Sequence, residues 1–153
     1  MNNENTLSHV DSQGRARMVD VGGKTEQVRI AEAEGIITLS GNARAQVAAA
    51  AVKKGDVLAI AEIAGIQAAK RTAELIPLCH PLITDQITVT ARLTDTGVAV
   101  TASVRCHGRT GAEMEALTAV SAALLTVYDM CKAVDKHMEI GGIRLTRKEK
   151  YDE

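Results

Sequence analysis

The stretch Gln86-Ile87-Thr88-Val89-Thr90-Ala91-Arg92-Leu93 alternates polar and apolar residues with a period of two, and residues 98–104 repeat the alternation. Between them, Asp95-Thr96-Gly97 has the composition of a tight turn. Successive side chains of a strand point to opposite faces, so this pattern is typical of a strand with one buried face. We therefore predict an antiparallel hairpin with one face in the core.

Helices are predicted on both sides of this hairpin. Before it, Asp56 caps an apolar pattern over residues 57–75 that covers nearly the whole helix circumference, which indicates burial on all sides or contact with another subunit. After it, a long helix is predicted from Thr110 to about residue 137, with Thr110 and Glu113 forming a capping box. A short helix over residues 43–52 is predicted to end at Gly55.

Two further strands complete the predicted order. One begins near Glu26 and is interrupted near Gly35, and the other covers residues 139–147. Without the short helix, the order is strand, helix, strand, strand, helix, strand. This predicts an α+β fold of the ferredoxin-like βαββαβ type, an antiparallel sheet with helices on one face. We expect a flexible N-terminal tail (1–13), one catalytic domain (14–147) and a C-terminal tail (148–153).

Composition limits the class of protein. The chain has 153 residues with no Phe, no Trp and two Tyr, so its core must come from smaller aliphatic side chains, and we expect an oligomer. A net charge of −1 gives no global field that favours nucleic acid or a membrane surface. Three cysteines without CxxC spacing, and no apolar N-terminal stretch, favour a reduced, cytoplasmic protein.

A stiff loop follows the second helix. Its sequence, Leu75-Ile76-Pro77-Leu78-Cys79-His80-Pro81, contains both prolines of the chain. Proline restricts itself and the residue before it, so the loop loses little conformational entropy on ordering and is well suited to carry a site. The structural alternative is a helix stop in which Cys79 is a small buried residue and His80 a hydrogen-bonded neighbour.

The last long helix carries charges among apolar residues. Asp129 and Lys132 are three residues apart and share a face, as an exposed ion pair would, but a covered acid–lysine pair is also suited to acid–base chemistry. Glu115 lies fourteen residues before Asp129, which is about 21 Å along one helix. If both carboxylates serve one small-molecule site, a second subunit must bring one of them.

Basic residues lie near the helix ends. Lys54 precedes the second helix, where backbone donors favour anions, and Lys70 and Arg71 end it. Basic residues at a helix C-terminus can equally serve the helix dipole alone. The four histidines are scattered without zinc-binding spacing, so no metal is expected.

Several motifs together resemble one family, the cyclic pyranopterin monophosphate synthases (MoaC) of molybdenum cofactor biosynthesis. The resemblance runs from about residue 7 to 145. The motifs are Met18-Val19-Asp20-Val21, Lys54-Gly55-Asp56, Ala64-Gly65-Ile66, Ala69-Lys70-Arg71-Thr72, the proline loop, Thr110-Gly111-Ala112-Glu113-Met114-Glu115-Ala116-Leu117 and Tyr128-Asp129-Met130-Cys131-Lys132-Ala133.

The resemblance implies a ferredoxin-like subunit in a homohexamer, a trimer of dimers with active sites at subunit interfaces. It also implies a lyase that converts (8S)-3′,8-cyclo-7,8-dihydroguanosine 5′-triphosphate to cyclic pyranopterin monophosphate and diphosphate. Asp129 and Lys132 would be the acid–base pair, and Lys54 a catalytic or phosphate-holding lysine. The residues implied to line or adjoin the substrate are Leu78, Cys79, His80, Glu113, Met114 and Glu115.

The residue types suit this chemistry. Ring opening and closure need proton transfer, which His80, Asp129 and Lys132 can supply. Loss of diphosphate from a triphosphate needs fixed positive charge, which we assign to Lys54, Lys70 and Arg71. No redox cofactor is required. Many relatives carry a glycine- and lysine-rich tail after the last strand, whereas here residues 147–150 lead directly to Tyr151-Asp152-Glu153.

Two other functions remain open from the sequence. A ferredoxin-like sensor or assembly module could bind a nucleotide without turning it over, and would need the lysines but not an intact acid–base pair. A zinc hydrolase could use Cys79 and His80, and would contain stoichiometric metal.

Overall fold

Four strands and four helices form the part of the chain that the computed structural model describes, residues 9–152. The predicted N-terminal tail therefore lies mostly outside the described residues. In chain order the elements are β1 (Gln27–Thr38), α1 (Gly41–Ala48), α2 (Val57–Lys70), α3 (Thr72–Leu75), β2 (Thr84–Leu93), β3 (Gly97–Gly108), α4 (Glu113–Cys131) and β4 (Ile140–Tyr151).

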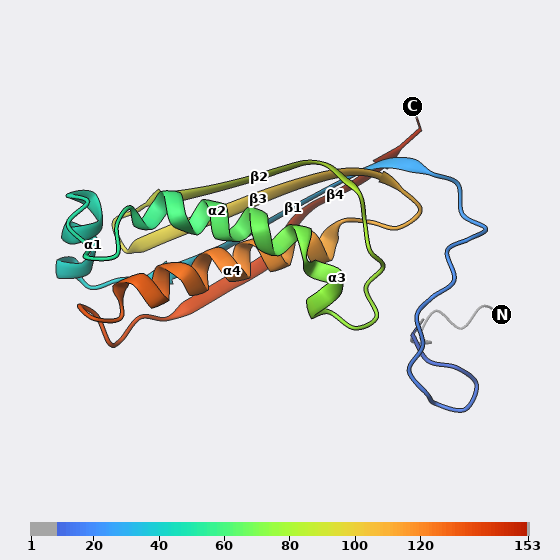
Figure 1. Ribbon diagram of the computed structural model, residues 1–153, viewed down its shortest axis with the longest axis horizontal. Coiled ribbons are helices and arrows are strands. Elements are labelled where there is room, and N and C mark those ends of the chain that lie inside the picture. The colour runs from blue at the N-terminus through green and yellow to red at the C-terminus, as the bar shows by residue number, and fades with distance from the viewer. Residues whose placement is uncertain (1–8, 153) are drawn as a thin grey trace.

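The strands form one antiparallel sheet in the order β2-β3-β1-β4. Both α2 and α4 lie across the same face of this sheet, while α1 and α3 lie at its two ends (Figure 1). The predicted hairpin is present, with Leu93 opposite Val98 across the turn. The ferredoxin-like α+β prediction is confirmed.

The core consists of small and medium aliphatic side chains, as the composition predicted. The buried residues of α2 recur every four positions, at Val57, Ala61, Gly65 and Ala69. A side chain at Gly65 would have its Cβ only 2.9 Å from the carbonyl oxygen of Ala119 on α4. Glycine therefore allows the two helices to approach closely, which offsets the absence of large aromatics.

A second glycine brings α4 close to the sheet. The predicted interruption near Gly35 is a register shift between Glu34 and Ile36 in the pairing of β1 with β4. A Cβ at Gly35 would lie 2.8 Å from Leu124 and 2.9 Å from Val120, both fully buried on α4. The irregularity thus lies where the central strand meets the core helix.

The short helix differs from its predicted end. Ser40 caps it, since its Oγ accepts a hydrogen bond from the Ala43 amide. It ends at Ala48, however, and Ala50 rather than Gly55 is the first residue with positive φ after it. Gly55 instead has φ +105° just before α2, which Asp56 caps through the Ala59 amide.

The predicted capping box at Thr110 was wrong. Helix α4 begins at Glu113 with Ala112 as its N-cap residue and without a side-chain cap. The Glu113 carboxylate folds back over Gly111 and forms an ion pair with Lys148 of β4, which takes it away from the geometry of a capping box.

Two boundaries near the C-terminus also differ. Helix α4 ends at Cys131 rather than near residue 137, because the chain turns there and the Asp135 carboxylate binds the Ser40 and His137 amides. Strand β4 continues to Tyr151, which pairs with Val28 of β1. Residues 148–151 therefore belong to the sheet, and the C-terminal tail predicted from residue 148 was wrong.

The second helix is divided and only partly covered. The stretch predicted as one helix over residues 57–75 consists of α2 and the single turn α3. Ile60 and Ile63 of α2 are exposed, so burial on all sides was wrong for the single chain, and contact with another subunit stays a prediction. Helix α4 alone, within the described residues, is long and apolar enough to cross a membrane, but half of it is buried as the core helix of this fold.

Candidate active site

Two lysines and an aspartate meet where α4 ends. Lys54 Nζ, from the loop before α2, lies 2.6 Å from Asp129 Oδ2 and 3.0 Å from the Asp129 carbonyl oxygen. Lys132 Nζ lies 2.7 Å from Asp129 Oδ1. One carboxylate thus carries two ammonium groups. The predicted Asp129–Lys132 pair is present, and Lys54, 75 positions away in sequence, joins it.

These charges are strongly coupled although they face solvent. Hydrogen bonds from Lys132 and then Lys54 lower the pKa of Asp129 to about 2, and Asp129 in turn raises the pKa of Lys132. About half of each of the three side chains is exposed. Asp129 is therefore ionised at neutral pH, and the described residues leave all three side chains about half open to water. The covering that would make them strong acid–base groups has to come from a substrate or a second subunit.

The proline loop forms the wall of a separate cavity of about 490 Å³. His80 Nε2 lies 2.7 Å from the carbonyl oxygen of Val19, in the segment before β1. This contact fixes the orientation of the ring and ties that segment to the loop. The residues that line the cavity are His9, Ile76, Leu78, Cys79, His80, Thr110, Gly111, Glu113 and Met114.

Glu115 is buried directly behind this cavity. It is 2% exposed, its Oε1 lies 3.8 Å from Cys79 Sγ, and its Oε2 has no hydrogen-bond partner within residues 9–152. Burial raises the pKa of Glu115, and burial followed by the nearby Glu115 carboxylate raises that of Cys79. The pair is therefore biased toward its protonated forms. A buried carboxyl oxygen without a partner is ready to bind a donor group of a ligand.

Glu113 has the opposite electrostatic character. Burial alone would raise its pKa, but the hydrogen bond from Lys148 and the charge of that lysine outweigh this effect and lower it. Glu113 is therefore ionised and linked to β4, whereas Glu115, two positions later on α4, is biased toward the neutral acid. The two carboxyl groups at this end of α4 can thus play different roles.

Lys70 and Arg71 lie on another side of Glu115. Together with Glu115 and Pro81 they border a small cavity of about 140 Å³ at the end of α2. Their positive charge is therefore next to the proline loop and remote from Lys54. The structure groups all of the predicted substrate residues at this end of α4.

The two clusters lie at opposite ends of the helix layer. The Lys54–Asp129–Lys132 cluster is at the end that carries α1, and the proline loop is at the end that carries α3 (Figure 1). Glu115 and Asp129 are both on α4, fourteen residues or about 21 Å apart. Of the predicted catalytic residues, the described part of one chain brings His80 together with the substrate-lining residues, but not Lys54, Asp129 and Lys132.

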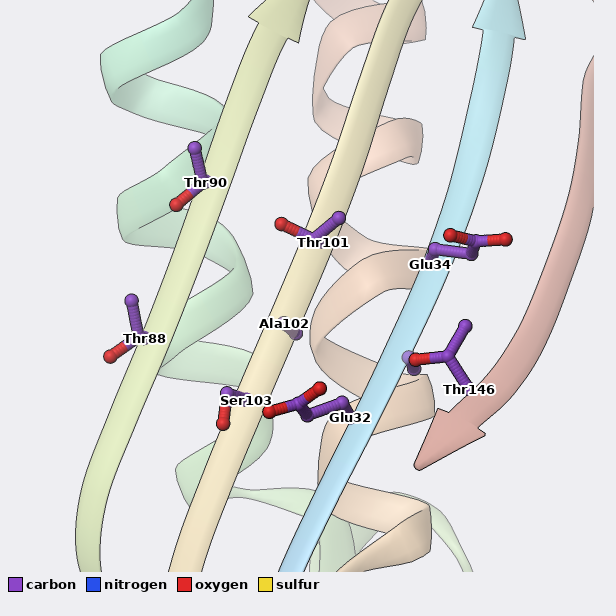
Figure 2. Close-up of a pocket in the computed structure, with 9 residues that line it drawn as sticks. Glu32, Glu34, Thr88, Thr90, Thr101, Ala102, Ser103 and Thr146 are labelled. Atoms are coloured by element: carbon purple, nitrogen blue, oxygen red, sulfur yellow. The ribbon is translucent and has the colours of Figure 1, made fainter. Parts of the chain in front are cut away.

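A third pocket, of about 400 Å³, lies on the open face of the sheet. Figure 2 shows four of its hydroxyl side chains, Thr88, Thr90, Thr101 and Ser103, on β2 and β3 and a fifth, Thr146, on β4, with the helices behind the sheet. Its two acids are paired: Glu32 with Arg147 at 3.1 Å and Glu34 with Arg144 at 2.6 Å. This pocket contains none of the predicted site residues, and its acids are neutralised by arginines.

Sequence reasoning missed three contacts in or near these clusters. Val19 binds His80 through a backbone carbonyl, which leaves no signal in residue type. Lys148 binds Glu113 across 35 residues, from a segment that was predicted as a tail. Asp135 anchors the turn after α4, and its position one helical turn beyond Lys132 was the available signal.

Across residues 9–152, no group of three or more His, Cys, Asp or Glu side chains is arranged to hold a metal ion. Cys79 and His80 make separate contacts, to Glu115 and to Val19 respectively. Within the described residues, the adjacent Cys79 and His80 therefore do not contact a common side chain that could complete a metal site with them.

The fold and the clusters define a ferredoxin-like protein with an acid–lysine centre at one end of α4 and a cavity lined in part by Glu113 at the other. The chain belongs to the MoaC family, whose model matches residues 18–150.

Three of the relatives of this chain are 55–56% identical to it over 144 aligned residues, and each is named cyclic pyranopterin monophosphate synthase. The protein of Roseiflexus sp. (strain RS-1) is 56% identical over 144 residues, which are 93% of this chain and 91% of the relative. That of Novosphingobium aromaticivorans is 55% identical over 94% of this chain and 92% of its own length. The protein of Chloroflexus aggregans is 56% identical over 93% of this chain and 87% of its own length.

Proposed function

We propose that this chain is a lyase of molybdenum cofactor biosynthesis that converts (8S)-3′,8-cyclo-7,8-dihydroguanosine 5′-triphosphate to cyclic pyranopterin monophosphate and diphosphate. The observation that carries the proposal is the identity of 55–56% to relatives named for this product, over about nine-tenths of the chain. The clusters at both ends of α4 supply residue types that the reaction needs.

The change of substrate into product defines two tasks. A triphosphate that becomes a cyclic monophosphate must form one oxygen–phosphorus bond within the molecule while the bond to the departing diphosphate breaks. The attacking hydroxyl must lose a proton, and the growing charge on the diphosphate must be compensated. The rearrangement of the rings needs further proton transfers.

We assign these tasks to the residues of the two clusters. Asp129 and Lys132 exchange protons with the substrate, and Lys54 either joins them or holds phosphate. When substrate excludes water, the interactions among these charges strengthen, and a proton can move from lysine to a substrate atom. His80 is a second proton carrier.

The remaining residues bind and orient the substrate. Leu78, Cys79 and Met114 provide the wall of the cavity, and the carboxyl groups of Glu113 and Glu115 face donor groups of the ring system. Lys70 and Arg71 offer charge for the phosphates. These assignments are supported by the grouping of all these residues near the N-terminal end of α4.

We further propose that the active site is assembled between subunits of a homohexamer, a trimer of dimers in the cytoplasm. The separation of about 21 Å between Glu115 and Asp129 supports a shared site, because one small substrate cannot reach both within one chain. The exposed apolar residues Ile63 and Leu125 support burial against another copy.

The decisive experiment supplies the cyclised dihydro-GTP to purified protein and measures diphosphate and pterin together. Wild type should form both in equal amounts, while Asp129→Asn and Lys54→Ala should bind substrate and release neither. A nucleotide-sensing module would bind without turnover and would be indifferent to Asp129→Asn. A zinc hydrolase would lose its activity on removal of bound metal, whereas the proposed lyase should stay fully active in metal-free preparations of the protein.

A further inference from the structure

Asp135 is a buried acid in the turn after α4, outside both clusters. It is 7% exposed, and its two oxygens accept hydrogen bonds from backbone amides: Oδ2 from Ser40 at 2.6 Å and Oδ1 from His137 at 3.0 Å. These bonds, that of Ser40 first, lower the pKa of Asp135. An ionised acceptor in a buried position makes a stronger hydrogen bond than a neutral one.

The Ser40 bond places the start of α1 against the end of α4. Ser40 is also the N-cap of α1, through its Oγ and the Ala43 amide. From there the chain runs through α1 to Lys54, whose Nζ returns to Asp129 of α4. Segment 40–54 is thus attached to the end of α4 twice, at Ser40 through Asp135 and at Lys54 through Asp129.

The two attachments differ in strength. The Lys54–Asp129 pair is half exposed, and exposed ion pairs contribute little to holding two segments together. The Asp135–Ser40 bond is partly buried: Ser40 is exposed, but the Asp135 carboxylate that accepts the bond is 7% exposed, and a hydrogen bond to a buried charged acceptor is stronger than an exposed ion pair. The bond to the buried Asp135 carboxylate is therefore the one that can fix the geometry of the exposed pair.

We propose that Asp135 is a positioning residue of the Lys54–Asp129–Lys132 centre, which sets the approach of Lys54 to Asp129 by holding Ser40 at the end of α4. The importance of this geometry for turnover rests on the proposed function. The geometric role itself does not.

The test uses two variants that act on the same bond from opposite sides, one by weakening its acceptor and one by removing its donor. Asp135→Asn keeps the shape of the side chain but removes its charge. Ser40→Pro removes the amide hydrogen, and proline fits the φ of −59° at this position. Ser40→Ala is the matched control, because it removes only the hydroxyl and keeps the amide that Asp135 binds.

Two readouts separate positioning from general stability. In carbon-13 carboxyl NMR titrations, Asp135→Asn and Ser40→Pro should raise the pKa of Asp129 above its value of about 2, and Ser40→Ala should not. The same two variants should lower kcat by about 10- to 100-fold with little change in KM. Asp11→Asn, at another acid that accepts two backbone amides, should leave both readouts unchanged.

The positioning role is overturned if Asp135→Asn and Ser40→Pro fold and keep both the Asp129 pKa and the turnover of wild type. It is also overturned if neither variant folds, since the bond would then support the whole domain. If the pKa of Asp129 responds but wild type itself turns over no substrate, the positioning role stands and the proposed function fails.

Discussion

At the scale of single residues, Asp129 is a carboxylate held between two lysines. Its pKa of about 2 is a property of that neighbourhood, because the side chain itself is exposed and desolvation opposes the shift. A depressed pKa means that the native state binds the proton more weakly than the unfolded state. The stabilisation is complete above the ordinary value of 3.8 and is lost as pH falls through about 2.

Replacing either lysine should raise the pKa of Asp129 toward 3.8. Lys132→Ala should have the larger effect, because its hydrogen bond is the first cause of the shift, and Lys54→Ala the smaller. Carboxyl NMR titration of the two variants measures both. Lys53→Ala, which removes the adjacent charge, is the control. An unchanged pKa of Asp129 in the Lys132→Ala variant would contradict the ion pair between these two residues.

For Glu115 we predict the opposite dependence of stability on pH. Burial raises its pKa above 4.5, so the native state binds the proton more tightly and loses stability as pH rises through that raised value. Glu115→Gln keeps the shape without the charge. It should flatten this part of the curve of unfolding free energy against pH, measured with urea between pH 4 and 8. Parallel curves for wild type and variant would contradict the raised pKa.

At the scale of elements, the packing of α2 against α4 and β2 depends on Gly65. An alanine there would bring its Cβ within 2.9 Å of the Ala119 carbonyl oxygen and 3.0 Å of a Val89 methyl group, both in the core. We expect Gly65→Ala to lower the free energy of unfolding by about 1–3 kcal/mol. Urea unfolding measures this. Gly141→Ala, where a Cβ meets nothing within 4 Å, is the control, and equal losses would contradict close packing as the cause.

Periodicity explains which elements could be predicted. The hairpin around Asp95 and the apolar helices follow from alternation and spacing, because burial on one face acts on every residue of an element. The predicted helix boundaries were wrong where a single side chain binds a residue that is distant in sequence. Glu113 binds Lys148 instead of forming a capping box, and Asp135 binds Ser40 where a helix was expected to continue.

The candidate site was likewise predictable from the sequence only in part. Residue types and motif resemblance pointed to Asp129, Lys132 and the proline loop. The contact of Lys54 with Asp129 spans 75 positions and joins the loop before α2 to the end of α4, which no local pattern encodes. The burial of Glu115 beside Cys79 likewise arises only when the loop folds onto α4.

At the scale of the whole molecule, the distance between the Lys54–Asp129–Lys132 cluster and the proline loop has a consequence for how subunits assemble. The half-exposed Asp129 and the buried Glu115 occupy opposite ends of α4, and residues 9–152 of the same chain cover the acid–base centre only in part. Heterologous contacts between copies can place one end of a subunit against the other end of a neighbour. The shared site proposed above needs such a contact.

This arrangement predicts complementation between inactive variants. Asp129→Asn damages one half of a shared site and His80→Ala the other, so mixed oligomers should contain some sites with both halves intact. Random mixing in equal amounts should restore about one quarter of wild-type turnover, since each half is intact in about half of the sites. The measurement is diphosphate release after the two variants are unfolded and refolded together.

The control mixes Asp129→Asn with Lys132→Ala, which damage the same half, and should restore nothing. If the mixture of Asp129→Asn with His80→Ala is equally inactive although native mass spectrometry shows mixed oligomers, the shared site is contradicted. Asp129 and His80 would then not serve the same site, because a rigid helix of 19 residues keeps the two ends of α4 apart within one chain. Restored turnover would place the reaction between subunits and make oligomer formation a requirement for activity.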